Sequence, residues 1–315
     1  MRRKTLSSIF ALCLSLLTSC DSKGPEDRPD LLPPKILCVF CPGIGIAKKK
    51  TEDIRARVEK TIKRSGIGQL FISIMTSTLT KKESYEESIP IQSKRLVGRI
   101  EEEVERMMSS ETTEQPPIIF IGHSQGGLRA FLAATELVKK GYEVKCLVTI
   151  GSPLKGVGLL ADKVEAKRLA LDLGDIDKNM IELLDKSNQQ GINGMIPGSA
   201  LLEDIRKKLG KNTIPILAIG STFDLNEYRG ATADTKKSFN ELAGGSAHDG
   251  LISIESQLAE GIDKKHFECK TLENAHHGHL SKKRTDSPIS FKHDDFNKIF
   301  EGFVLRHAGE LLLVE

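Results

Sequence analysis

One serine in the sequence has neighbours that suit nucleophilic chemistry. Ser124 lies in the run Gly122-His123-Ser124-Gln125-Gly126, a Gly-x-Ser-x-Gly pattern. A serine hydroxyl becomes a strong nucleophile when a histidine takes its proton and backbone N–H groups receive the charge that develops on the attacked carbonyl. Glycines at 122 and 126 permit the sharp turn that would present it, because a Cβ there would collide with neighbouring backbone. Ser124 is therefore a candidate nucleophile that needs an acid, a base and two N–H donors from elsewhere.

The segments on either side of Ser124 fit this turn. Residues 117–121 form an apolar run typical of a buried strand, and Leu128, Phe131 and Leu132 follow at helical spacing. A nucleophile elbow requires this strand, turn and helix in this order. The agreement of all three favours an elbow over a purely structural turn.

Strand-like apolar runs alternate with helical periodicity from residue 35 onward. Strands are expected over residues 36–40, 70–75, 117–121, 144–150, 215–220 and 267–272, and helices over 54–62, 96–108, 128–138 and 296–304. This alternation predicts an α/β fold with a mostly parallel central sheet flanked by helices. Residues 156–213 contain apolar residues at mostly helical spacing and no strand-like run, which predicts a helical cap inserted after a strand.

With these motifs the chain resembles the α/β-hydrolase superfamily, and within it the lipases and palmitoyl-thioesterase-like acyl hydrolases. Ser124-Gln125-Gly126-Gly127 is similar to the thioesterase form of the elbow, and the resemblance in element order covers roughly residues 35–310. The resemblance implies an α/β-hydrolase fold with a helical cap. It also implies a serine hydrolase that cleaves ester or thioester bonds of acyl, lipid-like substrates without a cofactor.

The resemblance further implies an oxyanion hole built from two backbone N–H groups. Gln125, the residue after the nucleophile, is expected to supply the first. Residues 39–45, Val-Phe-Cys-Pro-Gly-Ile-Gly, look like the His-Gly-x-Gly loop of bacterial lipases and place Ile44 as the second donor. Pro42 stands where that family usually has histidine, a change that leaves the backbone donor in place.

The acid should precede the histidine in chain order in such an enzyme. Asp249 begins the run Asp-Gly-Leu-Ile, which is similar to the Asp-Gly-x-Val segment that carries the acid in lipase-like hydrolases. Asp224, just beyond the strand expected at 215–220, is the alternative, because some lipases place the acid directly after that strand. Asp249 is favoured on the longer match.

The histidine should lie on the loop after the last strand, where His276, His277 and His279 all occur. The catalytic histidine of the family is often followed by an aliphatic residue, as in His279-Leu280, so His279 is the expected base and His277 the alternative. No matching carboxylate or cysteine set lies near this cluster, so no metal site is expected. His123 is expected to pack within the elbow.

Two further segments favour a capped, lipase-like enzyme over a minimal esterase. Residues 151–156, Gly-Ser-Pro-Leu-Lys-Gly, resemble the loop that borders the acyl pocket in lipase-like enzymes. Residues 196–202 are similar to a cap segment of the same enzymes.

The N-terminus has the charged, apolar and small-residue order of an export signal. Leu17-Thr18-Ser19-Cys20 resembles the lipobox of bacterial lipoproteins. We therefore expect a signal peptide over residues 1–19, a lipidated flexible tether over 20–34 and a hydrolase domain over 35–315. A lipid on Cys20 would hold the exported protein on a bacterial cell membrane, inner or outer, whereas an ordinary signal peptide or an uncleaved anchor is the alternative.

Composition excludes several other classes. A chain of 315 residues with 39% hydrophobic and 28% charged residues fits a soluble globular domain better than a disordered or polytopic membrane protein. The net charge of +3 comes from residues 2–4, and without them 43 basic residues balance 43 acidic ones, so no nucleic-acid partner is expected. Cys38, Cys41 and Cys146 lie in or beside strand-like runs and are expected to be structural thiols.

Two classes of function fit these features. The first is a lipid-anchored serine hydrolase, and the second is a non-enzymatic binding lipoprotein that keeps a hydrolase scaffold. A degenerate enzyme usually loses a member of its triad, whereas serine, aspartate and histidine all occur here in the required order. The hydrolase is therefore favoured.

Overall fold

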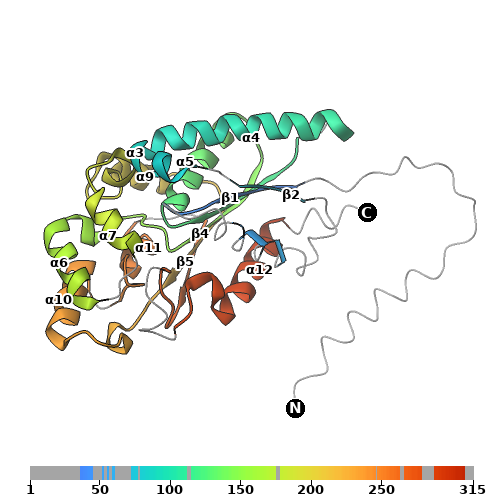
Figure 1. Cartoon of the computed structure of the whole chain (residues 1–315). Coiled ribbons are helices and arrows are strands. Elements are labelled where there is room, and N and C mark those ends of the chain that lie inside the picture. The colour runs from blue at the N-terminus through green and yellow to red at the C-terminus, as the bar shows by residue number, and fades with distance from the viewer. Residues whose placement is uncertain are drawn as a thin grey trace, which may run out of the picture. The chain divides into compact units, whose positions relative to one another are not determined.

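The computed structural model contains a sheet of six parallel strands, hydrogen-bonded in the order β2-β1-β3-β4-β5-β6 (Figure 1). The strands are β1 (Ile36–Cys41), β2 (Ile72–Thr76), β3 (Ile118–His123), β4 (Val144–Ile150), β5 (Ile216–Ser221) and β6 (Phe267–Leu272). The α-helices are α3 (Lys81–Glu86), α4 (Ile89–Glu111), α5 (Gln125–Lys139), α6 (Lys163–Leu173), α7 (Lys178–Asp185), α8 (Gln190–Asn193), α9 (Ala200–Leu209), α10 (Ala233–Ala243), α11 (Ile254–Gln257) and α12 (Asp294–Ala308). Short 3₁₀ helices are η2 (Gly158–Leu160), η3 (Leu225–Glu227) and η4 (Ser290–Lys292).

The structure describes most of the chain from residue 36 to residue 308. The described ranges are 36–44, 72–76, 79–111, 115–174, 178–245, 247–262, 266–278 and 287–308, with a few single positions between 52 and 60. The expected signal peptide, the tether with Cys20, His279 and most of the helix expected at 54–62 lie outside these residues. Everything described belongs to the second of two compact units, which spans Pro34–Glu315.

Strands β1, β3 and β5 and most of β4 are buried on both faces because their side chains alternate between two apolar cores. In β1, residues 37, 39 and 41 join one core while residues 36, 38 and 40 join the other. A parallel sheet covered on both sides has this pattern of near-continuous apolar strands. The pairing of Cys41 with Gly122 brings the end of β1 beside the end of β3.

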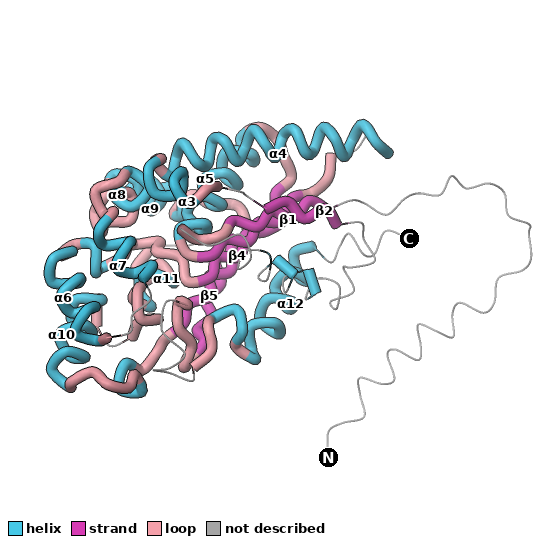
Figure 2. Tube along the Cα trace, viewed as in Figure 1, coloured by secondary structure: helices cyan, strands magenta, loops and turns pink. Residues whose placement is uncertain are grey.

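Helices cover the two faces of the sheet separately, as Figures 1 and 2 show. Residues of α4 and α5 belong to the core on one face. α12 packs on the other face through Phe296, Phe300, Phe303 and Val304, which are all buried. Burying each such side chain contributes about 1.5–3 kcal/mol, so α12 is a firm part of the domain.

Residues 156–213, which we call the cap segment, hold η2, α6, α7, α8 and α9 and no strand among their described positions. α6 and α7 gather with α10 at one end of the domain (Figure 1). α10 packs against α6, and α3 packs against α8, so helices from outside the segment complete this cluster. Its limits as a separate cap remain a prediction.

The predicted α/β fold class is confirmed. All six predicted strands are present, with ends shifted by at most two residues, because long apolar runs bounded by polar turns mark buried strands clearly. Helices α3, α10 and α11 were not predicted. They are short, and α10 has only two buried side chains, Phe239 and Ala243, so its apolar periodicity is weak.

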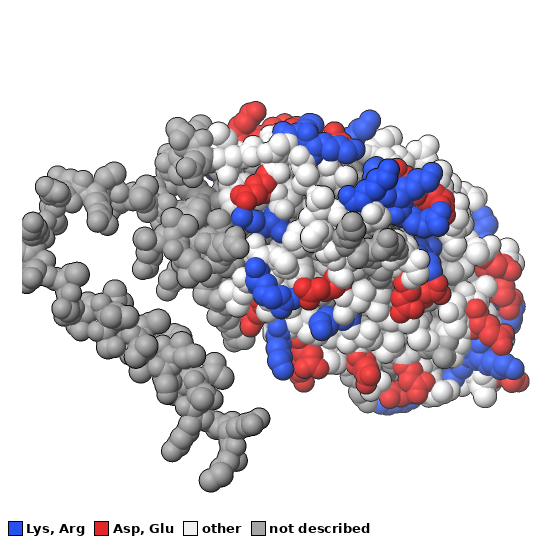
Figure 3. Space-filling view, turned by 180° about the vertical axis from the view of Figure 1, so that it is seen from behind, with Lys and Arg blue, Asp and Glu red and all other residues white. Residues whose placement is uncertain are grey.

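The described surface mixes both signs of charge. Figure 3 shows basic and acidic side chains interspersed over the rear face, in keeping with their similar numbers in the sequence. None of the described helices is both long enough and apolar enough to cross a bilayer.

Candidate active site

Ser124 occupies a tight turn between β3 and α5. Its backbone has φ 55° and ψ −132°, a conformation that residues other than glycine rarely adopt. A Cβ on Gly122 would lie 2.4 Å from the Gly127 Cα, and one on Gly126 would lie 2.1 Å from the Cys41 carbonyl oxygen. The glycines are therefore required by close backbone approach, and strain of this kind in a non-glycine residue is typical of functional sites.

Ser124 and Asp249 are joined through His277. The Ser124 Oγ lies 2.9 Å from Nε2 of His277, and the other ring nitrogen, Nδ1, lies 2.7 Å from Oδ2 of Asp249. An ionised carboxylate can only accept, so Nδ1 carries the proton and Nε2 is left to accept from the serine hydroxyl. Ser124 is 7% exposed, His277 9% and Asp249 0%, so the three groups lie almost entirely away from bulk water.

The turn around Asp249 holds its carboxylate firmly. Its Oδ1 accepts from the N–H groups of Leu251 and Ile252 at 3.0 and 2.8 Å, which leaves Oδ2 directed at His277. Asp224, the alternative acid, is exposed, and its side chain caps η3 by accepting from the Asn226 N–H. The structure therefore brings Asp249, and not Asp224, to the serine.

The preference for His279 needs correction. His277, the alternative, stands between Ser124 and Asp249, while His279 lies outside the described residues. The aliphatic residue after His279 does not decide between the two histidines, because long-range backbone bonds fix the position of His277. The His277 N–H donates to the Asp249 carbonyl at 2.9 Å, and the His276 N–H donates to the Pro288 carbonyl at 2.9 Å.

Gly151 and His123 also lie near the hydrogen-bonded relay formed by Ser124, His277 and Asp249, and local sequence patterns indicated them only weakly. Gly151 follows β4 with φ 53°, and a Cβ there would lie 3.2 Å from His277 Nδ1 and 3.4 Å from Asp249 Oδ2. In the sequence, the position of Gly151 directly after a predicted strand was the sign of this close approach to His277 and Asp249. His123 packs within the elbow as expected, and its ring stacks on that of His277 with centroids 5.1 Å apart.

The two expected oxyanion donors lie on adjoining segments. Gln125 is the first residue of α5, so its N–H has no helical carbonyl partner and is free for an external acceptor. Ile44 lies three residues beyond the end of β1. A Cβ on Gly126 would also lie 2.5 Å from the Pro42 carbonyl oxygen, so the segment leading to Ile44 abuts the elbow.

The buried cysteines do not offer a competing nucleophile. Cys38, Cys41 and Cys146 are free and buried, and burial raises the pKa of Cys38 to about 12 and that of Cys41 to about 11. These thiols stay protonated near neutral pH and therefore pack as small apolar groups. Within the described ranges, no three His, Cys, Asp or Glu side chains are grouped to hold a metal ion.

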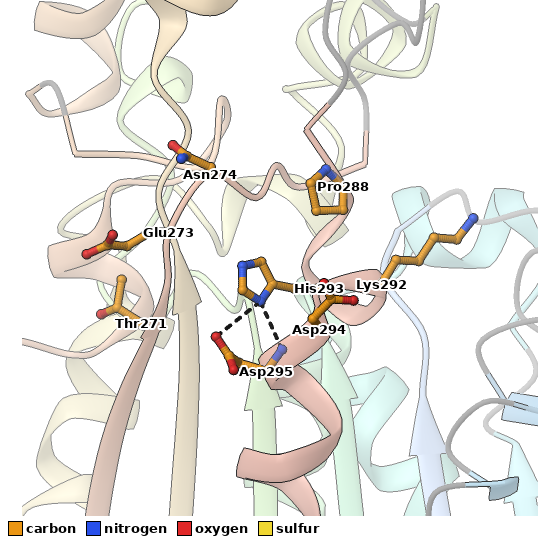
Figure 4. A pocket seen from close by; sticks show the side chains of 8 residues that line it. All are labelled: Thr271, Glu273, Asn274, Pro288, Lys292, His293, Asp294 and Asp295. Atoms are coloured by element: carbon orange, nitrogen blue, oxygen red, sulfur yellow. Dashed lines mark hydrogen bonds and ion pairs between the residues drawn. The ribbon is translucent and has the colours of Figure 1, made fainter.

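A polar cavity of about 640 Å³ lies next to the histidine loop, the loop after β6 that carries His276 and His277, as shown in Figure 4. It is lined by Thr271, Glu273, Asn274, Pro288, Lys292, His293, Asp294 and Asp295. None of the three relay residues lines it, and its charged walls do not suit an acyl chain. It is therefore distinct from the candidate active site.

Part of the sequence matches a known protein family, and the fold is similar to solved structures. Residues 47–171, which include Ser124, match the family described as Lipase (class 3). No curated protein matches the sequence. Solved structures of similar fold include phospholipase PlaB from Legionella pneumophila, with a TM-score of 0.56 and 12% identity over 89% of this chain and 60% of that one. Another is the lin2722 gene product of Listeria innocua, with a TM-score of 0.50 and 12% identity over 86% of this chain and 94% of that one. The chain therefore has the α/β-hydrolase fold, and its candidate nucleophile lies within the residues that match the class 3 lipase family.

Proposed function

We propose that the protein is a serine hydrolase that cleaves carboxylic ester or thioester bonds of acyl substrates. The observation that carries this proposal is the hydrogen-bonded chain from Ser124 through His277 to Asp249 at the tip of an elbow. The match to class 3 lipases and the lipase-like fold support an ester hydrolase. In this proposal His277 takes the role of general base that was expected of His279.

In the first half of the reaction Ser124 Oγ attacks the acyl carbonyl carbon while His277 Nε2 takes the hydroxyl proton. The buried Asp249 carboxylate stabilises the imidazolium that forms. The backbone N–H groups of Ile44 and Gln125 receive the negative charge on the carbonyl oxygen. Collapse of this intermediate expels the alcohol or thiol, which takes the proton back from His277, and leaves an acyl group on Ser124.

In the second half a water molecule gives a proton to His277 Nε2 and attacks the acyl-enzyme. The same donors stabilise the second oxyanion, and its collapse releases the carboxylic acid and restores the Ser124 hydroxyl. Both halves use one histidine in alternating roles. Its position between Ser124 and Asp249 is therefore needed whether the leaving group is an alcohol or a thiol.

The proposed acyl substrate class is supported by the apolar cap segment and by one structural neighbour. The cap segment contributes many apolar side chains to the core, and PlaB is described as a phospholipase. We expect kcat/KM to rise with acyl length in a series of p-nitrophenyl esters and matched acyl-thioesters, since each buried methylene contributes up to about 0.8 kcal/mol. A steady fall from the acetyl ester upward would instead indicate a small-ester hydrolase.

We also propose that Cys20 carries a lipid that anchors the exported protein to a bacterial cell membrane. The support is the order of charged, apolar and small residues before Cys20. Replacing Cys20→Ser should release the protein from the membrane fraction or leave its signal uncleaved. Mass spectrometry that finds an unmodified mature terminus at another residue would contradict the anchor.

The enzymatic proposal is tested by labelling with a fluorophosphonate probe. Wild-type protein should be labelled once, and Ser124→Ala should lose both labelling and about 10⁶-fold in p-nitrophenyl ester turnover. Ser238→Ala, on helix α10, is the matched control and should label normally. Folded wild-type protein that neither labels nor hydrolyses would overturn the proposal and favour a non-enzymatic binding lipoprotein.

A further inference from the structure

Arg129 is a buried cation beside the Cys41 thiol, and no carboxylate among the described residues pairs with it. It lies one turn after Gln125 in α5, is 1% exposed, and forms no ion pair with any carboxylate in the described part of the chain. Burial lowers the pKa of its guanidinium, and the nearby N-terminal end of α5 adds an unfavourable positive dipole. Taking a charge out of water costs several kcal/mol, and an apolar side chain of similar size often packs as stably. Simple core packing therefore does not account for an arginine here.

One hydrogen bond of Arg129 reaches the segment that carries an expected oxyanion donor. Its Nη2 donates to the Pro42 carbonyl oxygen at 2.6 Å, and its Nη1 donates to Oε1 of Gln92 at 2.9 Å. Gln92 is itself oriented, because its Nε2 donates to the Glu87 carbonyl at 2.7 Å. The guanidinium thus links the end of β1 to α4 through well-placed donors.

The Pro42 carbonyl is important because of its place in the chain. It belongs to the peptide unit that joins Pro42 to Gly43, and the next peptide unit carries the N–H of Ile44. Gly43 separates the two units and, lacking a Cβ, gives little resistance to rotation. Fixing the Pro42 carbonyl therefore restricts the direction in which the Ile44 N–H can point.

Gln125, the other expected donor, is held in place through its side chain. The Gln125 side chain donates from Nε2 to the Gly191 carbonyl at 2.8 Å and to the Ser84 carbonyl at 3.1 Å. Gln125 and Arg129 lie on one face of α5, since they are four residues apart. One face of α5 thus holds the Pro42 carbonyl, close to Ile44 in the chain, and anchors the side chain of Gln125.

We propose that Arg129 is a positioning residue that sets the oxyanion hole before substrate binds, which rests on the proposed hydrolase function. Preorganised donors stabilise the developing oxyanion without reorganising during the reaction. Without the guanidinium, the segment from Pro42 to Ile44 loses its anchor, and the Ile44 N–H must be ordered again in each transition state. The loss then falls on kcat rather than on KM, because the substrate carbonyl in the ground state depends little on this donor.

The test compares Arg129→Met and Arg129→Lys with the control Arg106→Met, whose arginine is exposed on α4 and pairs with Glu103. Active sites are counted by fluorophosphonate titration, so that kcat refers to reactive enzyme alone. For Arg129→Met we expect kcat per site to fall about 10- to 100-fold, less than the 10²–10³-fold lost with an oxyanion donor itself. KM should stay within about threefold, and affinity for a trifluoromethyl ketone should weaken in parallel with kcat. For Arg129→Lys we expect a kcat per site between that of the wild type and that of Arg129→Met, because the lysine ammonium keeps the charge and can replace one of the two donors.

Each result has a clear meaning. A kcat per site within about twofold of wild type in Arg129→Met, even with fewer active sites, overturns the proposal and leaves Arg129 as a structural residue. If Arg129→Met does not fold, Gln92→Met removes the Nη1 acceptor, and it should lower kcat per site about threefold or more. An unchanged value for that variant also overturns the proposal. Wild-type protein without labelling or turnover overturns the proposed function itself, which separates the two failures.

Discussion

The nucleophile elbow and the histidine loop hold neighbouring members of one relay by different means. The elbow is determined locally, because three glycines within six residues permit a backbone path that a Cβ would block. The histidine loop is held by distant segments: Ala275 donates to the Thr222 carbonyl, His276 to that of Pro288 and His277 to that of Asp249. Substitutions that add atoms should therefore disrupt the elbow, whereas substitutions that remove hydrogen-bond partners should disrupt the histidine loop.

Asp249 holds His277 through both its side chain and its backbone. Asp249 contributes its side chain to His277 Nδ1 and its carbonyl to the His277 N–H. The acid turn, which is the turn that carries Asp249, therefore fixes the position of His277 as well as the orientation of its ring. The elbow contacts His277 through the Ser124 hydroxyl and through the stacked ring of His123.

The sharpest test of the histidine loop compares His277→Ala with His279→Ala. The first should lower kcat/KM by roughly four to six orders of magnitude, because it removes the ring nitrogen that lies 2.9 Å from the Ser124 hydroxyl. The second should change it by less than about threefold. Both are measured by p-nitrophenyl ester hydrolysis, and a severe loss in His279→Ala alone would restore the original assignment.

The acid turn is tested by Asp249→Asn against Asp224→Asn. An amide at 249 can donate to Nδ1 and so favours the wrong imidazole tautomer, which should lower kcat by about four orders of magnitude. Asp224→Asn should leave kcat unchanged, since its side chain only caps η3. Equal effects of the two substitutions would mean that the contact between Asp249 and His277 is not catalytic.

The difference between the two regions also decides what can be predicted from sequence. The elbow is predictable because its glycines, strand and helix are adjacent in the chain and obey local sterics. The choice between His277 and His279 depends on backbone bonds to residues 222, 249 and 288, which no local pattern records. For the same reason Arg129 was overlooked, because a helix that is apolar around it gives no sign of a partner 87 residues earlier.

The elbow is tested by adding one methyl group. A Cβ in Gly126→Ala would meet the carbonyl oxygens of Cys41 and Pro42 at 2.1 and 2.5 Å, so the backbone must shift. We expect kcat to fall about 10- to 100-fold and the melting temperature to drop by several degrees, because overpacking costs about 1–3 kcal/mol. Gly98→Ala, in α4 with nothing within 4 Å of the new methyl, should be neutral or stabilising. Equal melting temperatures for the two variants would contradict the steric account.

The smallest expected effect concerns His248, the neighbour of the acid. The His248 Nδ1 accepts from the Gly250 N–H at 2.9 Å, and its Nε2 lies 2.7 Å from Asn240 Oδ1, so the neutral ring has its proton on Nε2. Burial lowers the pKa of His248 below its ordinary value, opposed by the nearby Asp249 charge. A protonated Nδ1 could no longer accept from Gly250, which would loosen the Asp249 turn.

The sign of the pH effect follows from that lowered pKa. The unfolded chain binds a proton at His248 near the ordinary pKa of about 6.5, whereas the folded protein binds it only at lower pH. The stability that neutral His248 provides is therefore complete above about pH 6.5 and is lost as pH falls through the folded pKa. At pH 7.5 His248→Gln should be less stable by about 1 kcal/mol, the net contribution of one hydrogen bond. In urea unfolding at several pH values this difference should shrink from pH 7 to pH 5, because only the wild type loses stability through this group. A constant difference over that range would show that His248 does not titrate with unfolding.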